Sequence, residues 1–366
     1  MTDRLYVTSP LLPDLGRFKE SLDEIWESRW LTNGGRFHRE FEKRLAERLG
    51  VEYISVFTNG TLPLMAALEL TKGDNPGLDE VITTPYSFVA TSNVLHWLDL
   101  KPVFVDVDRF GNIDPDGIEE AMTERTLAVL AVHVYGNPCQ VERIGEIAGR
   151  RGARVVYDAA HAFGVEKNGR SILLDGDFST LSFHATKVFN TLEGGALVCH
   201  SEAMKRRIDN FKNFGIEDEV TVSEFGINCK MDEVRAAYGL LNLERVDGAV
   251  EWRRQATMAY RSGLAGIDGI SFFDDIDGVK HNYSYFPVFV GEGYRLSRDG
   301  LYNHLKENGI FARRYFYPLI SDFKIYDGCR KFDLANARRL ADSVLCLPLY
   351  NDISLDDVER VIEVIR

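Results

Sequence analysis

The stretch VEYISVFTNGTLPLMAALEL, residues 51–70, joins a strand-like run to a turn and then to a helix-patterned segment. Residues 53–57 form the apolar strand-like run. Gly60 in the turn permits close approach of the backbone, and free N–H groups at a helix start favour an anion such as phosphate. The turn Asn59-Gly60-Thr61 is explained as well by ordinary helix capping, because Asn and Thr are preferred caps.

The same order of strand and helix recurs along the first 200 residues. Apolar strand-like runs lie at residues 53–57, 81–84, 103–107, 127–134, 154–157, 180–183 and 196–199. Helix-patterned segments lie between the earlier runs, at residues 61–70, 89–98, 116–122 and 141–150. This alternation predicts an α/β fold with a mostly parallel central sheet and helices on both faces.

The pattern changes after residue 200. Helical segments are expected at residues 202–214, 231–243 and 250–264, followed by a mixture of short strands and helices. A chain of 366 residues fits about two domains. We therefore expect a large domain over residues 1–245 and a smaller α+β domain over residues 246–366, packed together without a linker.

Charge and cysteine content argue against several classes of protein. The chain has 43 Lys and Arg against 56 Asp and Glu, a net charge of −13, which argues against nucleic acid or an anionic membrane as main partner. The five cysteines are scattered without a CxxC pair, so neither a disulfide framework nor a zinc site is expected. We predict a reduced, cytoplasmic protein with no metal site.

Residues whose side chains could bind a ligand or take part in a reaction follow the predicted strands, at the edge where parallel sheets bind ligands. Phe88 follows residues 81–84 and could cover a planar ligand, although core packing is the commoner reason for an aromatic residue. Asp158 ends the run 154–157 and is costly to bury unless it pairs with a cation. It could cap a turn, bind a metal or pair with a protonated heterocycle.

Two further residues are basic. His161 follows Asp158 by three residues, and taken alone it is equally a hydrogen-bonded core histidine. Lys187 follows the run 180–183. A lone lysine in a loop is normally solvated, but Lys187 lies between apolar runs rather than in a cluster of charges. A desolvated lysine has a lowered pKa, and its neutral amine can form a Schiff base.

Taken together, these residues meet the requirements of pyridoxal 5'-phosphate (PLP). A helix start can hold the phosphate, an aromatic ring can cover the pyridine ring, an aspartate can pair with its nitrogen, and a lysine can form an imine. The combination predicts PLP more strongly than any single member does.

The ordered motifs resemble the DegT/DnrJ/StrS family of sugar aminotransferases, which share the fold-type-I architecture of aspartate aminotransferase. The resemblance covers nearly the whole chain. It rests on NGT at 59–61, ITTPYSFVAT at 82–91, PVFVDVD at 102–108, HVYGNPC at 133–139, VVYDAAHAFG at 155–164, SFHATK at 182–187, EGGA at 193–196 and GINCKMDE at 226–233.

The resemblance implies a role for each matching residue. Lys187 would form the internal aldimine with PLP and later shuttle a proton, and Asp158 would keep the pyridine nitrogen protonated. Phe88 would stack on the ring, and His161 would contact the ring oxygen or the opposite face. The implied phosphate contacts are Gly60, Thr61, Ser182, Asn228 from the other subunit, and Lys230, where some relatives have arginine. A homodimer with shared active sites is therefore expected.

The resemblance also implies a substrate. Residues in positions where relatives contact a nucleotide sugar are Thr32, His281, Asn282, Tyr283, Arg314 and Tyr317, although ordinary surface loops explain these residues as well. Residues 25–35 and 187–196 are most similar to the dTDP-4-amino-4,6-dideoxyglucose type. The implied reaction moves an amino group from glutamate to C4 of dTDP-4-keto-6-deoxyglucose.

Several alternatives remain open at this point. The alternative acceptors are a 3-keto-sugar and a UDP-linked keto-sugar. A second possible function is that of a PLP-binding regulator without turnover. Relatives that dehydrate carry histidine at the lysine position, so Lys187 favours transamination. The absence of GxGxxG after the first strand argues against a nucleotide-dependent dehydrogenase.

Overall fold

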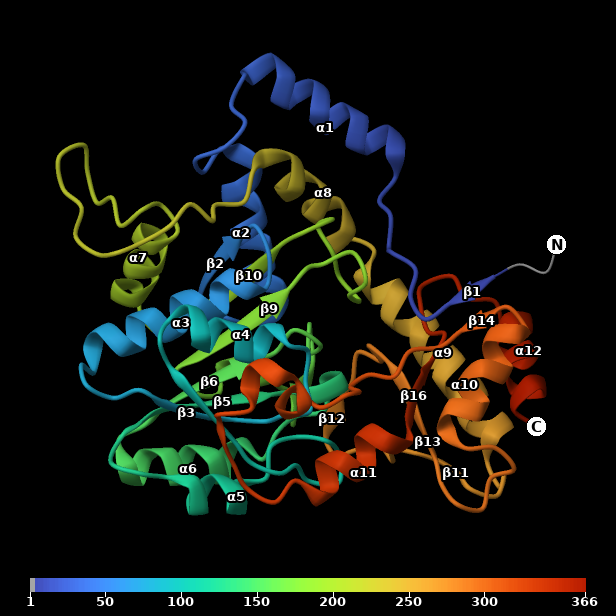
Figure 1. Cartoon of the computed structure of the whole chain (residues 1–366). Coiled ribbons are helices and arrows are strands. Elements are labelled where there is room, and N and C mark those ends of the chain that lie inside the picture. Colours follow the sequence, from blue (N-terminus) through green and yellow to red (C-terminus); the bar gives the residue numbers. More distant parts are fainter. Residues whose placement is uncertain (1–3) are drawn as a thin grey trace.

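A computed structural model of the chain describes residues 4–366. Within them the central sheet has eight strands in the order β15-β4-β3-β5-β6-β9-β10-β2 (Figure 1). The strands are β2 (Tyr53–Phe57), β3 (Glu80–Thr83), β4 (Lys101–Phe104), β5 (Thr126–Val132), β6 (Arg154–Asp158), β9 (Phe178–Ser182), β10 (Gly195–Cys199) and β15 (Arg330–Lys331). Every neighbouring pair is parallel except the two pairs made by β10.

Helices cover both faces of this sheet because the strands are apolar on both faces. On β5, Ala128 and Leu130 pack with α3 (Thr61–Asp74) and α4 (Ala90–Trp97). Val129 points the other way and packs with α5 (Pro115–Ala121) and α6 (Val141–Arg151). The α/β prediction is confirmed.

Two helices near the N-terminus and two after the sheet complete this part. They are α1 (Leu15–Ser28), α2 (Arg36–Leu49), α7 (Glu202–Phe211) and α8 (Glu233–Leu243). Gly50 ends α2 with a φ of 64°, a left-handed conformation that glycine adopts readily. Trp26 on α1 is 68% exposed.

The C-terminal part has its own sheet and core. The sheet order is β11-β13-β16, and the strands are β11 (Ile270–Phe272), β13 (Phe286–Val290) and β16 (Val344–Leu347). Its helices are α9 (Val246–Leu264), α10 (Arg298–Glu307), α11 (Ala335–Ser343) and α12 (Leu355–Ile365). A third sheet joins β7 (Glu166–Lys167), β8 (Arg170–Ser171) and β12 (Val279–Lys280).

Within the described residues, three strand pairs cross the predicted boundary at residue 245. β1 (Leu5–Tyr6) pairs with β14 (Ile310–Phe311), β12 pairs with β7, and β15 adds to the edge of the central sheet beside β4. These pairs explain how the two parts pack without a linker. The division at residues 245 and 246 stays a prediction, and residues 1–3 of the first predicted domain lie outside the described part. No helix within residues 4–366 is long and apolar enough to cross a membrane.

Candidate active site

The carboxyl ends of the parallel strands bring three of the predicted residues to one edge of the sheet. Gly60 follows β2, Asp158 ends β6 and Ser182 ends β9. Because β2 and β9 both pair with β10, Gly195 of β10 lies opposite both Phe57 and Ser182. A Cβ atom at position 60 would lie 2.9 Å from the Ser182 hydroxyl, so this close approach requires glycine.

The turn before α3 contains the predicted cap. Asn59 Oδ1 accepts hydrogen bonds from the N–H groups of Thr61, at 3.0 Å, and Leu62, at 3.1 Å. The ordinary capping reading is therefore correct for Asn59. It does not conflict with an anion site, because the turn also places Thr61 and the Ser182 hydroxyl beside Gly60.

Asp158 and Lys187 interact electrostatically across the site. Asp158 is 6% exposed, and burial raises the pKa of its carboxyl group, while hydrogen bonds and the Lys187 charge oppose that rise. Burial lowers the pKa of the half-buried Lys187 amine to about 8, against the opposing effect of Asp158. A lysine whose pKa is lowered by burial thus interacts electrostatically with a buried carboxylate.

His161 is held as a neutral ring beside these groups. Its Nδ1 accepts a hydrogen bond of 3.2 Å from the Tyr135 N–H, which places the ring proton on Nε2. Phe316 stacks on the ring with a centroid distance of 5.7 Å. Burial lowers the pKa of His161 well below its usual range, so the ring stays uncharged at neutral pH.

Phe88 lies on a cleft beside this edge. Its side chain is 60% exposed and lines a cleft of about 270 Å³ together with Arg313, Arg314 and Tyr317. Arg314 lies over the Tyr317 ring at 5.3 Å. The structure thus brings two predicted substrate residues, Arg314 and Tyr317, next to the predicted ring-stacking residue.

The other predicted substrate residues lie elsewhere. His281 and Tyr283 line a separate cavity of about 200 Å³, with Tyr135 in its wall. Asn282 is buried and donates to the carbonyl oxygens of His161, at 2.8 Å, and Phe163, at 3.0 Å, so it supports the turn after β6. Thr32 is exposed between α1 and α2. The substrate roles of these residues stay predictions.

Asn228 and Lys230 lie on the segment that leads into α8. The carbonyl oxygen of Cys229 accepts a hydrogen bond of 3.0 Å from the Thr58 N–H, so the segment runs beside the end of β2. Lys230 Nζ donates to Asn213 Oδ1 at 2.5 Å. The phosphate-contact roles of Asn228 and Lys230 also stay predictions.

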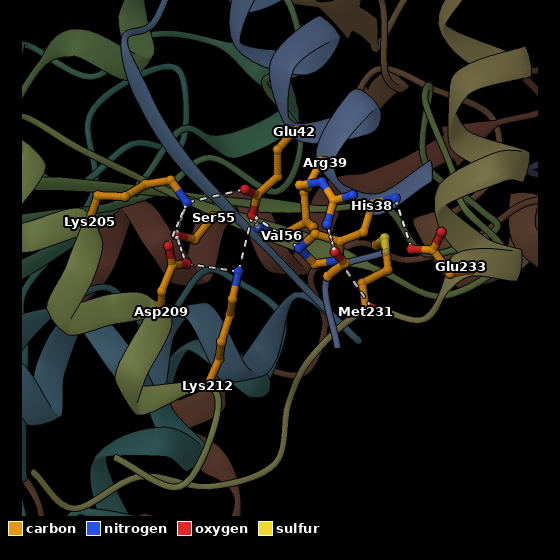
Figure 2. Close-up of polar contacts among 11 residues, drawn as sticks. His38, Arg39, Glu42, Ser55, Val56, Lys205, Asp209, Lys212, Met231 and Glu233 are labelled. Carbon is orange, nitrogen blue, oxygen red and sulfur yellow. Dashed lines mark hydrogen bonds and ion pairs between the residues drawn. The ribbon is translucent and has the colours of Figure 1, made fainter. Parts of the chain in front are cut away.

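Sequence reasoning missed a partly buried ionic cluster behind this segment, formed by Glu42, Lys205, Asp209 and Lys212 (Figure 2). Lys212 Nζ lies 3.1 Å from Glu42 Oε1 and 2.8 Å from Asp209 Oδ1. The spacing of residues 205, 209 and 212 puts them on one helical face, which is a signal in the sequence. Their pairing with Glu42 depends on the tertiary fold.

The site fits PLP. The glycine-requiring turn beside the Ser182 hydroxyl suits a phosphate, the exposed Phe88 ring offers a stacking face, and Asp158 offers a buried carboxylate. A lysine with a lowered pKa completes the donor set. The fold and this site define a fold-type-I PLP-dependent aminotransferase.

Comparison with known proteins gives the family. The model of the DegT/DnrJ/EryC1/StrS aminotransferase family matches residues 15–366, and the chain belongs to this family. The chain is 50% identical to the dTDP-4-amino-4,6-dideoxy-D-glucose transaminase of Shigella dysenteriae, over 100% of this chain and 99% of that protein. It is 45% identical to the transaminase of the same name from Escherichia coli, over 97% of this chain and 96% of that protein.

Solved structures agree with this assignment. DesI, crystallised in the presence of its TDP-sugar product, superposes with a TM-score of 0.93 at 36% identity, over 100% of this chain and 92% of that chain. The PseC aminotransferase of Helicobacter pylori superposes with a TM-score of 0.92 at 25% identity, over 99% and 98% of the two chains. The predicted family and enzyme class, a sugar aminotransferase, are confirmed.

Proposed function

We propose that this enzyme uses PLP, held on Lys187, to move an amino group from glutamate to C4 of dTDP-4-keto-6-deoxyglucose. The observation that carries the mechanism is the buried Asp158 carboxylate at the carboxyl end of β6, which interacts electrostatically with the Lys187 amine. The observation that carries the substrate is the 50% identity to a dTDP-4-amino-4,6-dideoxy-D-glucose transaminase along the whole chain.

The phosphate of PLP would lie at the turn after β2. Gly60 lets the turn approach the Ser182 hydroxyl closely, and Thr61 follows at the start of α3. Asp158 would hold the proton on the ring nitrogen, and Phe88 would cover one face of the ring. When bound, PLP supplies a carbonyl carbon that exchanges amino groups and a ring that withdraws electrons.

Lys187 is the proton-transfer group. A general base works best when its pKa lies near the operating pH, and the lowered pKa of about 8 satisfies this condition. Nζ of Lys187 would therefore both accept and return a proton. The neutral His161 contributes an N–H donor at Nε2, without adding a second positive charge that would raise the energy of the protonated Lys187.

The cleft beside Phe88 is the proposed entrance for the nucleotide sugar. Arg314 offers a guanidinium group, which suits a diphosphate, although Asp299 already lies 2.9 Å from its Nη1. Tyr317 offers a flat aromatic surface at the same cleft. A local cationic group can bind an anionic substrate on a protein whose net charge is −13.

We further propose a homodimer with shared active sites. Large apolar side chains are exposed on two elements that project from the body of the chain, α1 and the segment 214–225 (Figure 1). Trp26 is 68% exposed, Val220 is 93% exposed and Phe225 is 91% exposed. Exposed apolar surface of this kind is typical of a protein interface. The segment continues directly into Asn228, the residue predicted to reach the partner's phosphate site.

The test is turnover with defined substrates. Purified protein is incubated with glutamate and with dTDP-4-keto-6-deoxyglucose, its 3-keto isomer or a UDP-linked keto-sugar, and the products are identified by NMR. We expect a product aminated at C4 from the first acceptor only. Amination at C3, or a preference for the UDP sugar, would overturn the substrate proposal. Protein that stays colourless with added PLP, and that borohydride does not label at Lys187, would overturn the cofactor proposal.

A further inference from the structure

Two buried hydroxyl groups stand behind Asp158. The Thr91 hydroxyl donates to Asp158 Oδ2 at 2.9 Å, and the Ser87 hydroxyl lies 2.8 Å from the Thr91 hydroxyl. Ser87 is 5% exposed and Thr91 is 1% exposed. Because Thr91 has one hydroxyl proton and gives it to Asp158, the proton between the two hydroxyls comes from Ser87.

Neither hydroxyl caps α4, which contains Thr91 near its start. The N-cap of α4 is Val89, and no side chain caps the helix there. Thr91 instead joins two parts of the site, because its N–H donates to the carbonyl oxygen of Phe88 at 3.1 Å while its hydroxyl contacts Asp158. The predicted ring-covering residue and the predicted ring-nitrogen partner are therefore connected through one side chain.

The direction of these hydrogen bonds favours an ionised Asp158. The other carboxylate oxygen, Oδ1, accepts from the Ala160 N–H at 3.1 Å, so donors reach both oxygens. Burial acts in the opposite direction and favours the neutral acid. Donors on both oxygens also fix the plane of the carboxylate, while each oxygen keeps a lone pair for a further partner.

We propose that Thr91, supported by Ser87, is a positioning residue that keeps Asp158 charged and oriented toward the ring nitrogen of PLP. The proposal rests on the cofactor assigned under the proposed function. It gives a role to a residue whose hydroxyl would otherwise only fill space in the core. The effect reaches the cofactor through Asp158, so it depends on the proton at the ring nitrogen.

The experiment measures cofactor binding rather than turnover. Apoenzyme is titrated with PLP and with the PLP analogue in which carbon replaces the ring nitrogen. Thr91→Val removes the hydroxyl at similar volume, and Thr91→Ser keeps it. For Thr91→Val we expect affinity for PLP to fall roughly 10- to 100-fold, the value of a hydrogen bond to a charged group. Affinity for the analogue should change little, because the analogue has no ring N–H group to donate a hydrogen bond to Asp158.

Thr91→Ser should restore binding of PLP close to wild type. Ser87→Ala should give an intermediate loss of affinity for PLP, since Thr91 keeps its hydrogen bond to Asp158. This variant tests the proposal if Thr91→Val does not fold. Equal losses for PLP and the analogue would show a merely structural role and overturn the proposal, as would unchanged affinity for PLP in Thr91→Val or in Ser87→Ala. Failure of wild-type protein to bind PLP would instead overturn the proposed function.

Discussion

Lys212 Nζ lies 3.1 Å from Glu42 Oε1, and this pair links two chain segments that lead to the proposed phosphate site. Glu42 Oε1 also accepts from the Val56 N–H at 2.9 Å, on the strand that leads to Gly60. The carbonyl oxygen of Lys212 accepts from the Cys229 N–H at 3.1 Å, next to Asn228. The partly buried ionic cluster therefore holds both segments against α2 (Figure 2).

Removing the Glu42 charge should destabilise the protein. In Glu42→Gln, Lys205 and Lys212 share only Asp209, so a partly uncompensated charge stays buried. We expect the free energy of unfolding in urea to fall by about 3 kcal/mol, and the double variant Glu42→Gln/Lys212→Met to lose less than the sum of the single variants. The matched control is Glu40→Gln on the same helix, which breaks the exposed Arg44–Glu40 pair and should change nothing measurable. Equal losses of stability in Glu40→Gln and Glu42→Gln would contradict the stabilising role given to the Glu42 charge.

The Glu42 contribution should disappear in acid. Burial acts to raise the pKa of Glu42, but the nearby Lys212 and Lys205 charges and His38 hold it well below its usual 4.5. A carboxyl group with a depressed pKa contributes stability above its unfolded pKa, and that stability is lost as the pH falls through the folded pKa. The stability gap between wild type and Glu42→Gln should stay constant from pH 7 to about 5 and narrow below about 4.5. Urea midpoints measured across that range check this, and a gap that widens in acid contradicts it.

The sequence predicted the central elements because their signals are local. The strand at Tyr53–Phe57 has the predicted bounds and α6 begins at the predicted residue 141, since each segment shows its own apolar pattern. β15 was missed because its two residues, Arg330 and Lys331, are polar and join the sheet only through the tertiary fold. Trp26 is apolar and lies on a helix, yet residues 4–366 leave it 68% exposed.

In the candidate site, too, local sequence signals predict some residues but not contacts that depend on the tertiary fold. Gly60 and Asp158 were predictable because each lies at the carboxyl end of a strand, and parallel topology puts strand ends together, whereas Ser182 was predicted from the family resemblance. His281 and Asn282 are adjacent in sequence, yet one lines a separate cavity and the other holds the backbone after Asp158. Both residues lie in the connection between β12 and β13, where no regular element fixes the side-chain directions, so a motif alone does not tell which of its members faces the substrate.

The Lys187 amine should control the pH dependence of cofactor capture. Burial lowers its pKa to about 8, so the neutral form predominates above pH 8 instead of only above the usual 10.5. The rate at which apoenzyme captures PLP should rise about tenfold per pH unit below pH 8 and level off above it. Stopped-flow absorbance measures the rate. Lys187→Arg, which stays protonated, should not capture the cofactor covalently, and a midpoint near 10 in wild type would contradict the lowered pKa.

Shared active sites should be detectable by mixing inactive variants. Lys187→Ala removes the amine, and Asn228→Ala removes the residue proposed to reach the partner's phosphate site. If both sites of a dimer use Asn228 from the other chain, a mixed dimer contains one site with neither substitution. Random exchange makes half of the dimers mixed, so the mixture should recover about a quarter of wild-type turnover. Unfolding and refolding the variants together allows the exchange, and each variant treated alone is the control. A mixture as inactive as the separate variants would place Asn228 in the site of its own chain, where the hydrogen bond between Cys229 and Thr58 brings its segment close to Gly60.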